Sequence, residues 1–138
     1  MEKVLIDTDV ILDFFFDRQP FSEHAANVLS LCELKKIQGF VTPVIISNVY
    51  YLLRQTAKHE KVIEKLSSLL SLTDVLIIDK QTIIQAINSK FKDFKDALQN
   101  YSAENAKEIN AILTRNTKDF KNSKIAVFTP ENYIKMKS

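Results

Sequence analysis

The sequence predicts an α/β protein in which a mostly parallel central sheet lies between two layers of helices, a three-layer α/β/α sandwich. Short apolar runs rich in β-branched residues alternate with longer segments of helical period, and this alternation is typical of parallel sheets. The composition, with 46% hydrophobic and 26% charged residues but one glycine and three prolines, favours long regular elements around one core. No internal repeat or linker divides the chain, so we expect residues 1–138 to form a single domain.

The first third of the chain is predicted to contain a strand, two helices and a second strand. The first strand covers residues 3–6 and is followed by a helix with Asp9 as its N-cap and four inward side chains: Val10, Ile11, Phe14 and Phe15. A second helix begins between residues 20 and 22 and ends near residues 35–36, after which Gly39 marks a turn. The second strand covers residues 39–42.

The rest of the chain continues this alternation. Pro43 and Pro130 each mark the start of a helix, because proline has the φ of a first helical turn and needs no N–H donor there. The predicted helices cover residues 43–53, 60–71, 79–88, 94–106 and 131–136, and the predicted strands cover residues 75–78, 109–114 and 125–128. Helices between the strands provide the crossovers that parallel strands require.

Composition excludes several classes of protein. The single cysteine, Cys32, forms no internal disulfide, and neither a signal-like N-terminus nor an apolar run of ~18 residues is present, so we expect a soluble, cytoplasmic protein without a membrane segment. Gly39 is the only glycine, which rules out a glycine-rich phosphate loop. His24 and His59 lack metal-ligand spacing, so no zinc site is expected. The net charge of +2 is too small to indicate nucleic-acid binding by itself.

The opening stretch VLIDTDVILDFFFD places four carboxylates in one of the most apolar parts of the chain: Asp7, Asp9, Asp13 and Asp17. Asp7 directly follows the first predicted strand, and ligands of parallel sheets bind at the carboxyl ends of the strands. Asp13 and Asp17 share one helix face at i, i+4 spacing, which we interpret as the solvent face. Asp7 is therefore the first candidate for a functional acid, the simpler alternative being a solvated strand end.

Three further acids follow predicted strands or begin predicted helices. Asp93 and Asp96 lie at the start of the helix 94–106, and Asp119 follows the strand 109–114 and a turn. Converging carboxylates repel one another unless a cation neutralises them. Oxygen ligands without histidine or cysteine favour Mg²⁺ or Mn²⁺, so the sequence predicts a site for one of these ions.

Four segments of the chain, in this order and at these separations, resemble the PIN domain: LIDTDVILD, DFKDALQ, TRNTKDF and VFTPENYI. The resemblance covers essentially the whole chain. It implies a small metal-dependent ribonuclease, of the kind that is often the toxin half of a bacterial toxin–antitoxin pair, with an acidic pocket at the carboxyl ends of parallel strands. Asp7 matches the family's first metal-binding aspartate and Asp96 matches a later one, so these two are the expected ligands of Mg²⁺ or Mn²⁺.

Two positions depart from the family's pattern. Asn48 stands where the family usually has a glutamate in the helix after the second strand, and Asn116 stands where it often has an aspartate two residues after a threonine, here Thr114. Asp93 and Asp119 are candidate substitutes. Two amides in place of two carboxylates lower the negative charge of the pocket, so we expect one ion rather than a two-metal site.

The resemblance also gives each candidate residue an expected role. The residues expected to act in cleavage are Asp7, Asp96, Asn116 and Asp119, and those expected to bind are Asn48, Asp93, Thr114 and Arg115. On this hypothesis Asp119 or Asp93 orients the attacking water, while Lys95, Arg115 and Lys118 are candidates to hold the RNA backbone. The expected partners are RNA, an antitoxin protein and a second copy of the chain, paired through apolar surface on the N-terminal helices.

Two rival hypotheses fit part of the same pattern. A catalytically degenerate domain of this fold would bind RNA or a protein without cutting, because Asn48 and Asn116 weaken the metal site. A haloacid-dehalogenase-type phosphatase would use Asp7 as nucleophile and Asp9 as general acid. The phosphatase hypothesis needs a downstream Gly-Asp-type acidic pair and a longer chain, and this sequence supplies neither.

Overall fold

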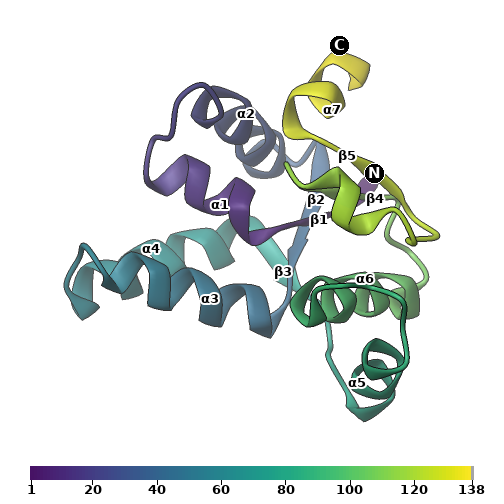
Figure 1. The fold of residues 1–138 in the computed structure, drawn as a ribbon. Coiled ribbons are helices and arrows are strands. Elements are labelled where there is room, and N and C mark those ends of the chain that lie inside the picture. The colour runs from purple at the N-terminus through teal and green to yellow at the C-terminus, as the bar shows by residue number, and fades with distance from the viewer. Residues whose placement is uncertain (138) are drawn as a thin grey trace.

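A computed structural model describes residues 1–137 as a five-stranded parallel sheet flanked by helices (Figure 1). The strands are β1 (Glu2–Ile6), β2 (Ile37–Val41), β3 (Thr73–Val75), β4 (Ala111–Leu113) and β5 (Ala126–Phe128). They lie in the order β3-β2-β1-β4-β5, and every neighbouring pair is parallel. The predicted α/β class with a parallel sheet is therefore confirmed.

Helices cover the sheet from two sides. They are α1 (Thr8–Phe15), α2 (Ser22–Glu33), α3 (Pro43–Arg54), α4 (His59–Leu72), α5 (Lys80–Ile87), α6 (Phe94–Ala106) and α7 (Pro130–Lys137), with a short 3₁₀ helix, η1 (Thr117–Phe120), after β4. Figure 1 shows α3 and α4 side by side, α2 next to α7, and α5 against α6 at one end of the molecule. None of the described helices is long and apolar enough to cross a membrane.

The two central strands hold the core together. Val4, Leu5 and Ile6 of β1 are fully buried, and so are Ile112 and Leu113 of β4. A parallel strand with helices on both faces buries both sets of its side chains, which explains why these segments read as continuous apolar runs. Each such side chain contributes about 1.5–3 kcal/mol by leaving water, so the ends of β1 and β4 are held on a rigid base.

The strand order also fixes where a ligand site can form. β2 and β3 lie on one side of β1, while β4 and β5 lie on the other. The strand order therefore switches between β1 and β4, and the crevice of such a sheet opens beyond the carboxyl ends of these two strands. Ile6 pairs with Leu113 in the register, which brings the next residues, Asp7 and Thr114, to the same edge.

Several sequence predictions at the ends of elements were wrong. The cap of α1 is Asp7, whose side chain accepts a hydrogen bond from the Thr8 N–H, and not Asp9. Gly39 lies inside β2 instead of at a turn. A larger residue does not fit there, because a Cβ atom would lie 2.6 Å from the Sγ of Cys32 on α2. The glycine thus permits close packing of α2 on the sheet.

Two apolar segments also differ from the prediction. The third strand covers Thr73–Val75 instead of residues 75–78, and Ile77 beyond it is exposed. Phe14 was expected to face the core but is 41% exposed, whereas Phe15 and Phe16 pack partly against it. A run of apolar residues gives no direct information on which of them a short edge strand or a short helix can cover.

Candidate functional site

A pocket of about 520 Å³ lies at the carboxyl ends of β1 and β4. It collects six of the eight predicted site residues: Asp7, Asn48, Asp93, Asp96, Asn116 and Asp119. They come from the end of β1, from α3, from the start of α6 and from the segment around η1. The pocket is also lined by Asp9, Arg18, Lys95 and Gln99, which adds a carboxylate that the prediction of a metal pocket did not include.

Asp7 is the most deeply set of these acids. Its side chain is only 8% exposed, its Oδ1 accepts a hydrogen bond of 2.8 Å from the Thr8 N–H, and its Oδ2 accepts one of 2.9 Å from the Thr114 hydroxyl. Burial, with the nearby charge of Asp9, raises the pKa of Asp7 to about 6 despite these two hydrogen bonds. Thr114 thus positions the Asp7 carboxyl group instead of lining the pocket itself.

Asp96 faces Asp7 from the first turn of α6. This helix is capped by Asp93, which accepts a 3.1 Å hydrogen bond from the Asp96 N–H. Burial and the negative charges of Asp7, Asp93 and Asp119 raise the pKa of Asp96 to about 7, although Lys95 acts in the opposite direction. The acids therefore interact with one another, as the sequence predicted for converging strand ends.

Asp9 completes the acidic cluster. Its Oδ2 accepts hydrogen bonds from the Arg115 N–H at 3.0 Å and, more weakly, from the Thr114 hydroxyl and the Asn116 amide, both at 3.4 Å. Its Oδ1 is buried and has no hydrogen-bond partner among residues 1–137, and burial raises its pKa. An unpaired buried carboxylate oxygen is costly when it is charged, in agreement with the raised pKa. The i, i+2 spacing of Asp7 and Asp9 entered the sequence analysis only in the phosphatase hypothesis, and Asp9 was not among the predicted residues of a metal pocket.

A buried hydrogen bond joins the two walls of the pocket. The Thr42 hydroxyl caps α3 by accepting from the Ile45 N–H at 3.1 Å and donates to Gln99 Oε1 of α6 at 2.6 Å. Both Thr42 and Gln99 are almost completely buried. This contact fixes the helix that carries Asn48 against the helix that carries Asp96.

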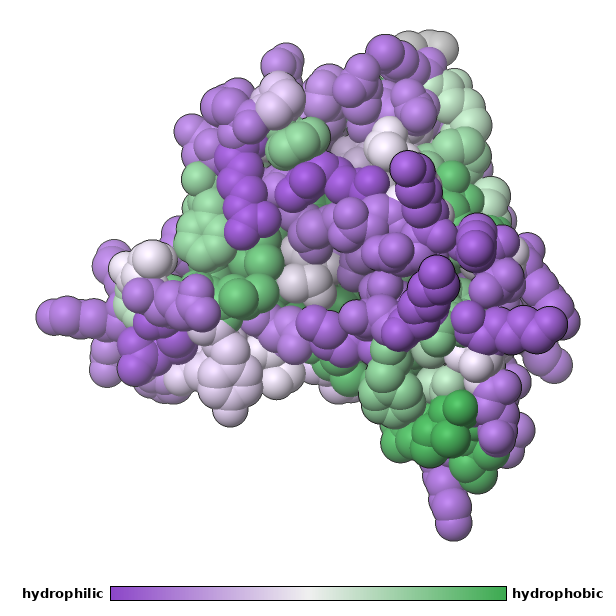
Figure 2. All heavy atoms as spheres, viewed as in Figure 1, coloured by the Kyte–Doolittle hydropathy of each residue, from purple (hydrophilic) through white to green (hydrophobic). Residues whose placement is uncertain are grey.

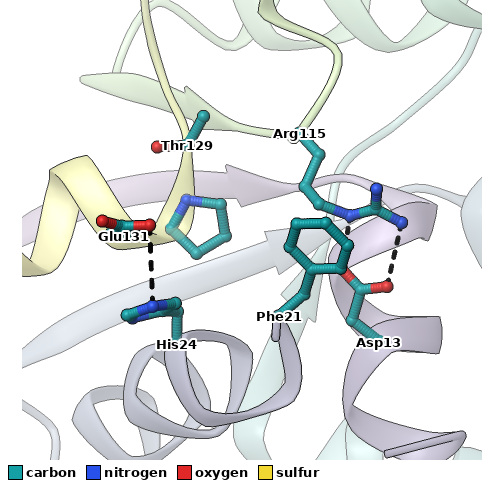
Figure 3. Close-up of a pocket in the computed structure, with 7 residues that line it drawn as sticks. Asp13, Phe21, His24, Arg115, Thr129 and Glu131 are labelled. Carbon is teal, nitrogen blue, oxygen red and sulfur yellow. Dashed lines mark hydrogen bonds and ion pairs between the residues drawn. The ribbon is translucent and has the colours of Figure 1, made fainter. Parts of the chain in front are cut away.

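Arg115, predicted as a binding residue, does not line this pocket: its backbone N–H contacts Asp9, but its side chain pairs with a different acid. Its Nε and Nη2 donate to the carboxylate of Asp13 at 2.6 and 3.0 Å, and its guanidinium lies 3.9 Å from the ring centre of Phe21 (Figure 3). Asp13 is 1% exposed, so its assignment to the solvent face is wrong, while Asp17 is exposed as predicted. A buried acid requires a paired cation, and here the segment after β4 supplies one to α1.

A smaller pocket of about 200 Å³ lies next to this ion pair and shares no lining residue with the acidic pocket. Phe21, His24 and Arg115 line it together with Glu131, and His24 Nε2 lies 3.7 Å from a Glu131 carboxylate oxygen (Figure 3). Both histidines lie on helices, His24 half-buried and His59 exposed, away from the acidic pocket, as the sequence predicted.

The donor set of the acidic pocket suits a hard cation. Asp7 and Asp96 supply carboxylate oxygens, and Asn48 and Asn116 add amide oxygens. In the described part of the chain no three acidic, histidine or cysteine side chains stand close enough to surround one ion. These residues therefore fit an ion that is coordinated by two carboxylates and takes water molecules as its remaining ligands.

The raised pKa of Asp96 should make the stability of the protein depend on pH. Because the pKa of Asp96 is about 7 in the folded state against an ordinary value of 3.8, the folded protein binds its proton more tightly, and stability falls as the pH rises between these values. We expect metal-free Asp96→Asn protein to exceed wild type in free energy of unfolding by about 1–2 kcal/mol at pH 8, after allowance for solvent screening at this partly exposed group. The difference should shrink towards zero near pH 4, as urea unfolding can measure. Glu60→Gln, an exposed acid on α4, is the charge-matched control.

Together these features define a class: an α/β domain with a carboxylate pocket at the switch point of a parallel sheet. The chain belongs to the PIN domain family, whose model matches residues 3–118. This match confirms the family resemblance seen in the sequence.

The known relatives agree with this assignment. The chain is similar to Ribonuclease VapC1 of Aquifex aeolicus (strain VF5), with 26% identity over 137 residues that cover 96% of this chain and 93% of the relative. A toxin–antitoxin complex from Klebsiella pneumoniae contains a similar chain, with a TM-score of 0.69 and 22% identity, covering 92% of this chain and 97% of that one. VapBC-1 from nontypeable Haemophilus influenzae gives a TM-score of 0.69 at 14% identity, covering 94% and 98%. The two structural matches show a shared fold.

Proposed function

We propose that this protein is a ribonuclease that hydrolyses RNA phosphodiesters with the help of a Mg²⁺ or Mn²⁺ ion held by Asp7 and Asp96. The observation that supports the proposal most strongly is that five acids line one pocket: Asp7, Asp9, Asp93, Asp96 and Asp119. Burial, and after it the repulsion between these acids, raises the pKa of Asp96 to about 7 and that of Asp7 to about 6. Lys95 offsets only part of this negative charge, because the pKa values of both acids remain raised, and such a group of acids suits a bound metal ion. The relative from Aquifex aeolicus is named as a ribonuclease, which supports the same activity.

The residues of the chain have distinct tasks in this proposal. A bound ion would supply charge neutralisation and a more acidic water molecule. Thr114 and the Thr8 N–H hold the Asp7 carboxylate in one orientation, so that it needs no rearrangement on binding. Asp119 and Asp93 line the pocket and are the candidates to orient the attacking water or to accept its proton. Lys95 lines the same pocket and can pair with a phosphate oxygen.

Titration of Mn²⁺ into the purified protein, followed by calorimetry, tests the metal part of the proposal without a guess about the substrate. Saturable binding that Asp7→Asn removes would support it, and cleavage of RNA that requires the ion would complete it. Absence of binding at millimolar Mn²⁺, both with and without RNA present, would favour the alternative, a binding module of this fold that does not cut.

The two pocket amides distinguish these functions further. Asn48 and Asn116 line the pocket but bring no charge. We expect Asn48→Glu and Asn116→Asp each to tighten Mn²⁺ binding by about tenfold, because the affinity of such sites follows the number of charged ligands. Calorimetry of each variant measures the change. Unchanged affinity in both would mean that the two amides do not face the ion.

We infer that the chain also binds an antitoxin protein and pairs with a second copy of itself. The similar solved structure from Klebsiella pneumoniae is a toxin–antitoxin complex, which supports the first partner. Exposed apolar side chains support protein contacts: Phe14 on α1, Tyr51 on α3 and three isoleucines of α5, Ile83, Ile84 and Ile87. On the face shown in Figure 2 the middle is mostly hydrophilic, and a hydrophobic area lies over α5. Light scattering of the purified protein, with Phe14→Glu and Ile87→Glu as variants, tests the pairing and its location.

A further inference from the structure

A second groove, of about 570 Å³, continues from the acidic pocket. One wall is the loop before α6 and the other is η1 with the residues after it. Asp93 and Asp119 line both the groove and the acidic pocket, so the two spaces meet at these acids. Four lysines line the groove, two on each wall: Lys90, Lys92, Lys118 and Lys121.

Aromatic contacts join the two walls. The rings of Phe91 and Phe120 meet edge to face with centres 6.0 Å apart, and Phe91 also contacts Tyr101 of α6 at 5.9 Å. Phe120 is 2% exposed, so η1 is fixed to the core. The Ser89 hydroxyl donates to the Ala86 carbonyl at 2.8 Å and accepts from the Phe91 N–H at 3.3 Å, which secures the loop. The loop before α6 and η1, which carry the lysines, are therefore held in defined positions by these contacts.

The positive charges of these lysines are not neutralised by ion pairs within the described part of the chain. All four are exposed, and within residues 1–137 none of the ion pairs includes any of them. The net charge of the whole chain is only +2, so this concentration of positive charge is local. Lysines that flank an aromatic anchor on both walls of a groove form an attractive surface for a regularly spaced polyanion.

We propose that this lysine groove binds the phosphate backbone of single-stranded RNA on one side of the bond to be cut and leads the strand into the acidic pocket. This inference rests on the proposed function. A ligand lying in the groove continues past Asp93 and Asp119 into the pocket, where Asp7 is recessed. A flexible single strand can bring a phosphate to a recessed site, whereas a duplex holds its phosphates on a rigid outer surface. Phe91 is engaged with other rings, so the groove holds the backbone and does not stack bases.

Fluorescence anisotropy of a labelled oligouridylate of about 12 nucleotides, measured with the wild-type protein in EDTA, tests the proposal. We expect replacement of all four groove lysines by glutamine to weaken binding at least tenfold at low salt. The slope of log K against log salt should become shallower by about 0.7 for each phosphate that the groove no longer neutralises. Replacement of the same four by arginine should keep the affinity within about threefold, because the charge remains.

A matched control removes four exposed lysines elsewhere: Lys35, Lys36, Lys58 and Lys61. If this control weakens binding as much as the groove variant, or if the groove variant binds as wild type does, the proposal is wrong. Displacement of the RNA by polyglutamate at lower concentration than by unlabelled RNA would also overturn it, in favour of an acidic protein ligand. Thermal unfolding of each variant verifies that it is folded.

The same variants separate this inference from the ribonuclease proposal. Mn²⁺-dependent cleavage by a groove variant that binds RNA like wild type would contradict the groove and leave the ribonuclease intact. Loss of RNA binding in the groove variant, with no cleavage by any of the proteins, would support the groove and contradict the ribonuclease.

Discussion

RNA cleavage is expected to fall by about 10³-fold, equivalent to about 4 kcal/mol, when Asp7 is replaced by asparagine. Asp7 is the acid fixed most firmly in the pocket, by the Thr8 N–H and the Thr114 hydroxyl, and it is one of the two proposed metal ligands. The amide has nearly the same shape, but it lacks the charge that attracts the ion and acidifies its water. Cleavage of single-stranded RNA in the presence of Mn²⁺ measures the effect.

The fold should survive this substitution. An asparagine oxygen can accept from the Thr8 N–H, and its amide group can donate to the Thr114 hydroxyl, whose own hydrogen can then turn towards Asp9, 3.4 Å away. Removal of the Asp7 charge also relieves Asp96, whose pKa it helps to raise. We therefore expect the thermal unfolding temperature of metal-free protein to stay the same or to rise. Asp17→Asn, an exposed acid in the same segment outside the pocket, should cut RNA as wild type does.

Activity that persists in Asp7→Asn would contradict the assigned role. If Asp96→Asn were then inactive, the ion would have to be held from α6 and not from the end of β1. If both variants remained active, cleavage would not depend on this pocket.

The acidic pocket could be predicted from the sequence because its position follows from topology. Asp7 and Thr114 come directly after strands that pair in parallel, and the carboxyl ends of parallel strands share one edge of the sheet. Asp96 follows a helix start, which local sequence also marks, since Asp93 is the cap. Strand order did not have to be known in detail for these residues to be grouped.

The errors concern features that depend on pairing across the fold. Asp13 and Arg115 are 102 residues apart in sequence, and their ion pair forms only because β4 pairs with β1, the strand that leads into α1. Helical spacing placed Asp13 and Asp17 on one face, but it carries no information about a cation from another part of the chain. For the same reason Asp9, which accepts hydrogen bonds from the segment after β4, was predicted as a cap of α1 and not as part of the metal pocket. Long-range pairing was the missing information in each case.

Replacement of Arg115 by methionine is expected to lower the free energy of unfolding by about 3–5 kcal/mol, because it leaves the buried carboxylate of Asp13 without its main partner. Arg18 lies 3.5 Å from the same carboxylate but is itself 41% exposed, so it compensates for only part of this destabilisation. The stacking of the guanidinium on Phe21 disappears as well. Urea unfolding at neutral pH gives the change directly.

Two further variants identify the cause. Arg18→Met should cost less than about 1 kcal/mol, as expected for an exposed partner. Asp13→Leu combined with Arg115→Met should recover much of the stability, because neither charge is then left buried alone. A single Arg115→Met variant with near wild-type stability but weaker RNA binding would instead restore the role suggested by its place in the TRNTKDF segment. In that case Arg115 would have to leave Asp13 when RNA binds, and the buried acid would have to pair with Arg18 in the complex.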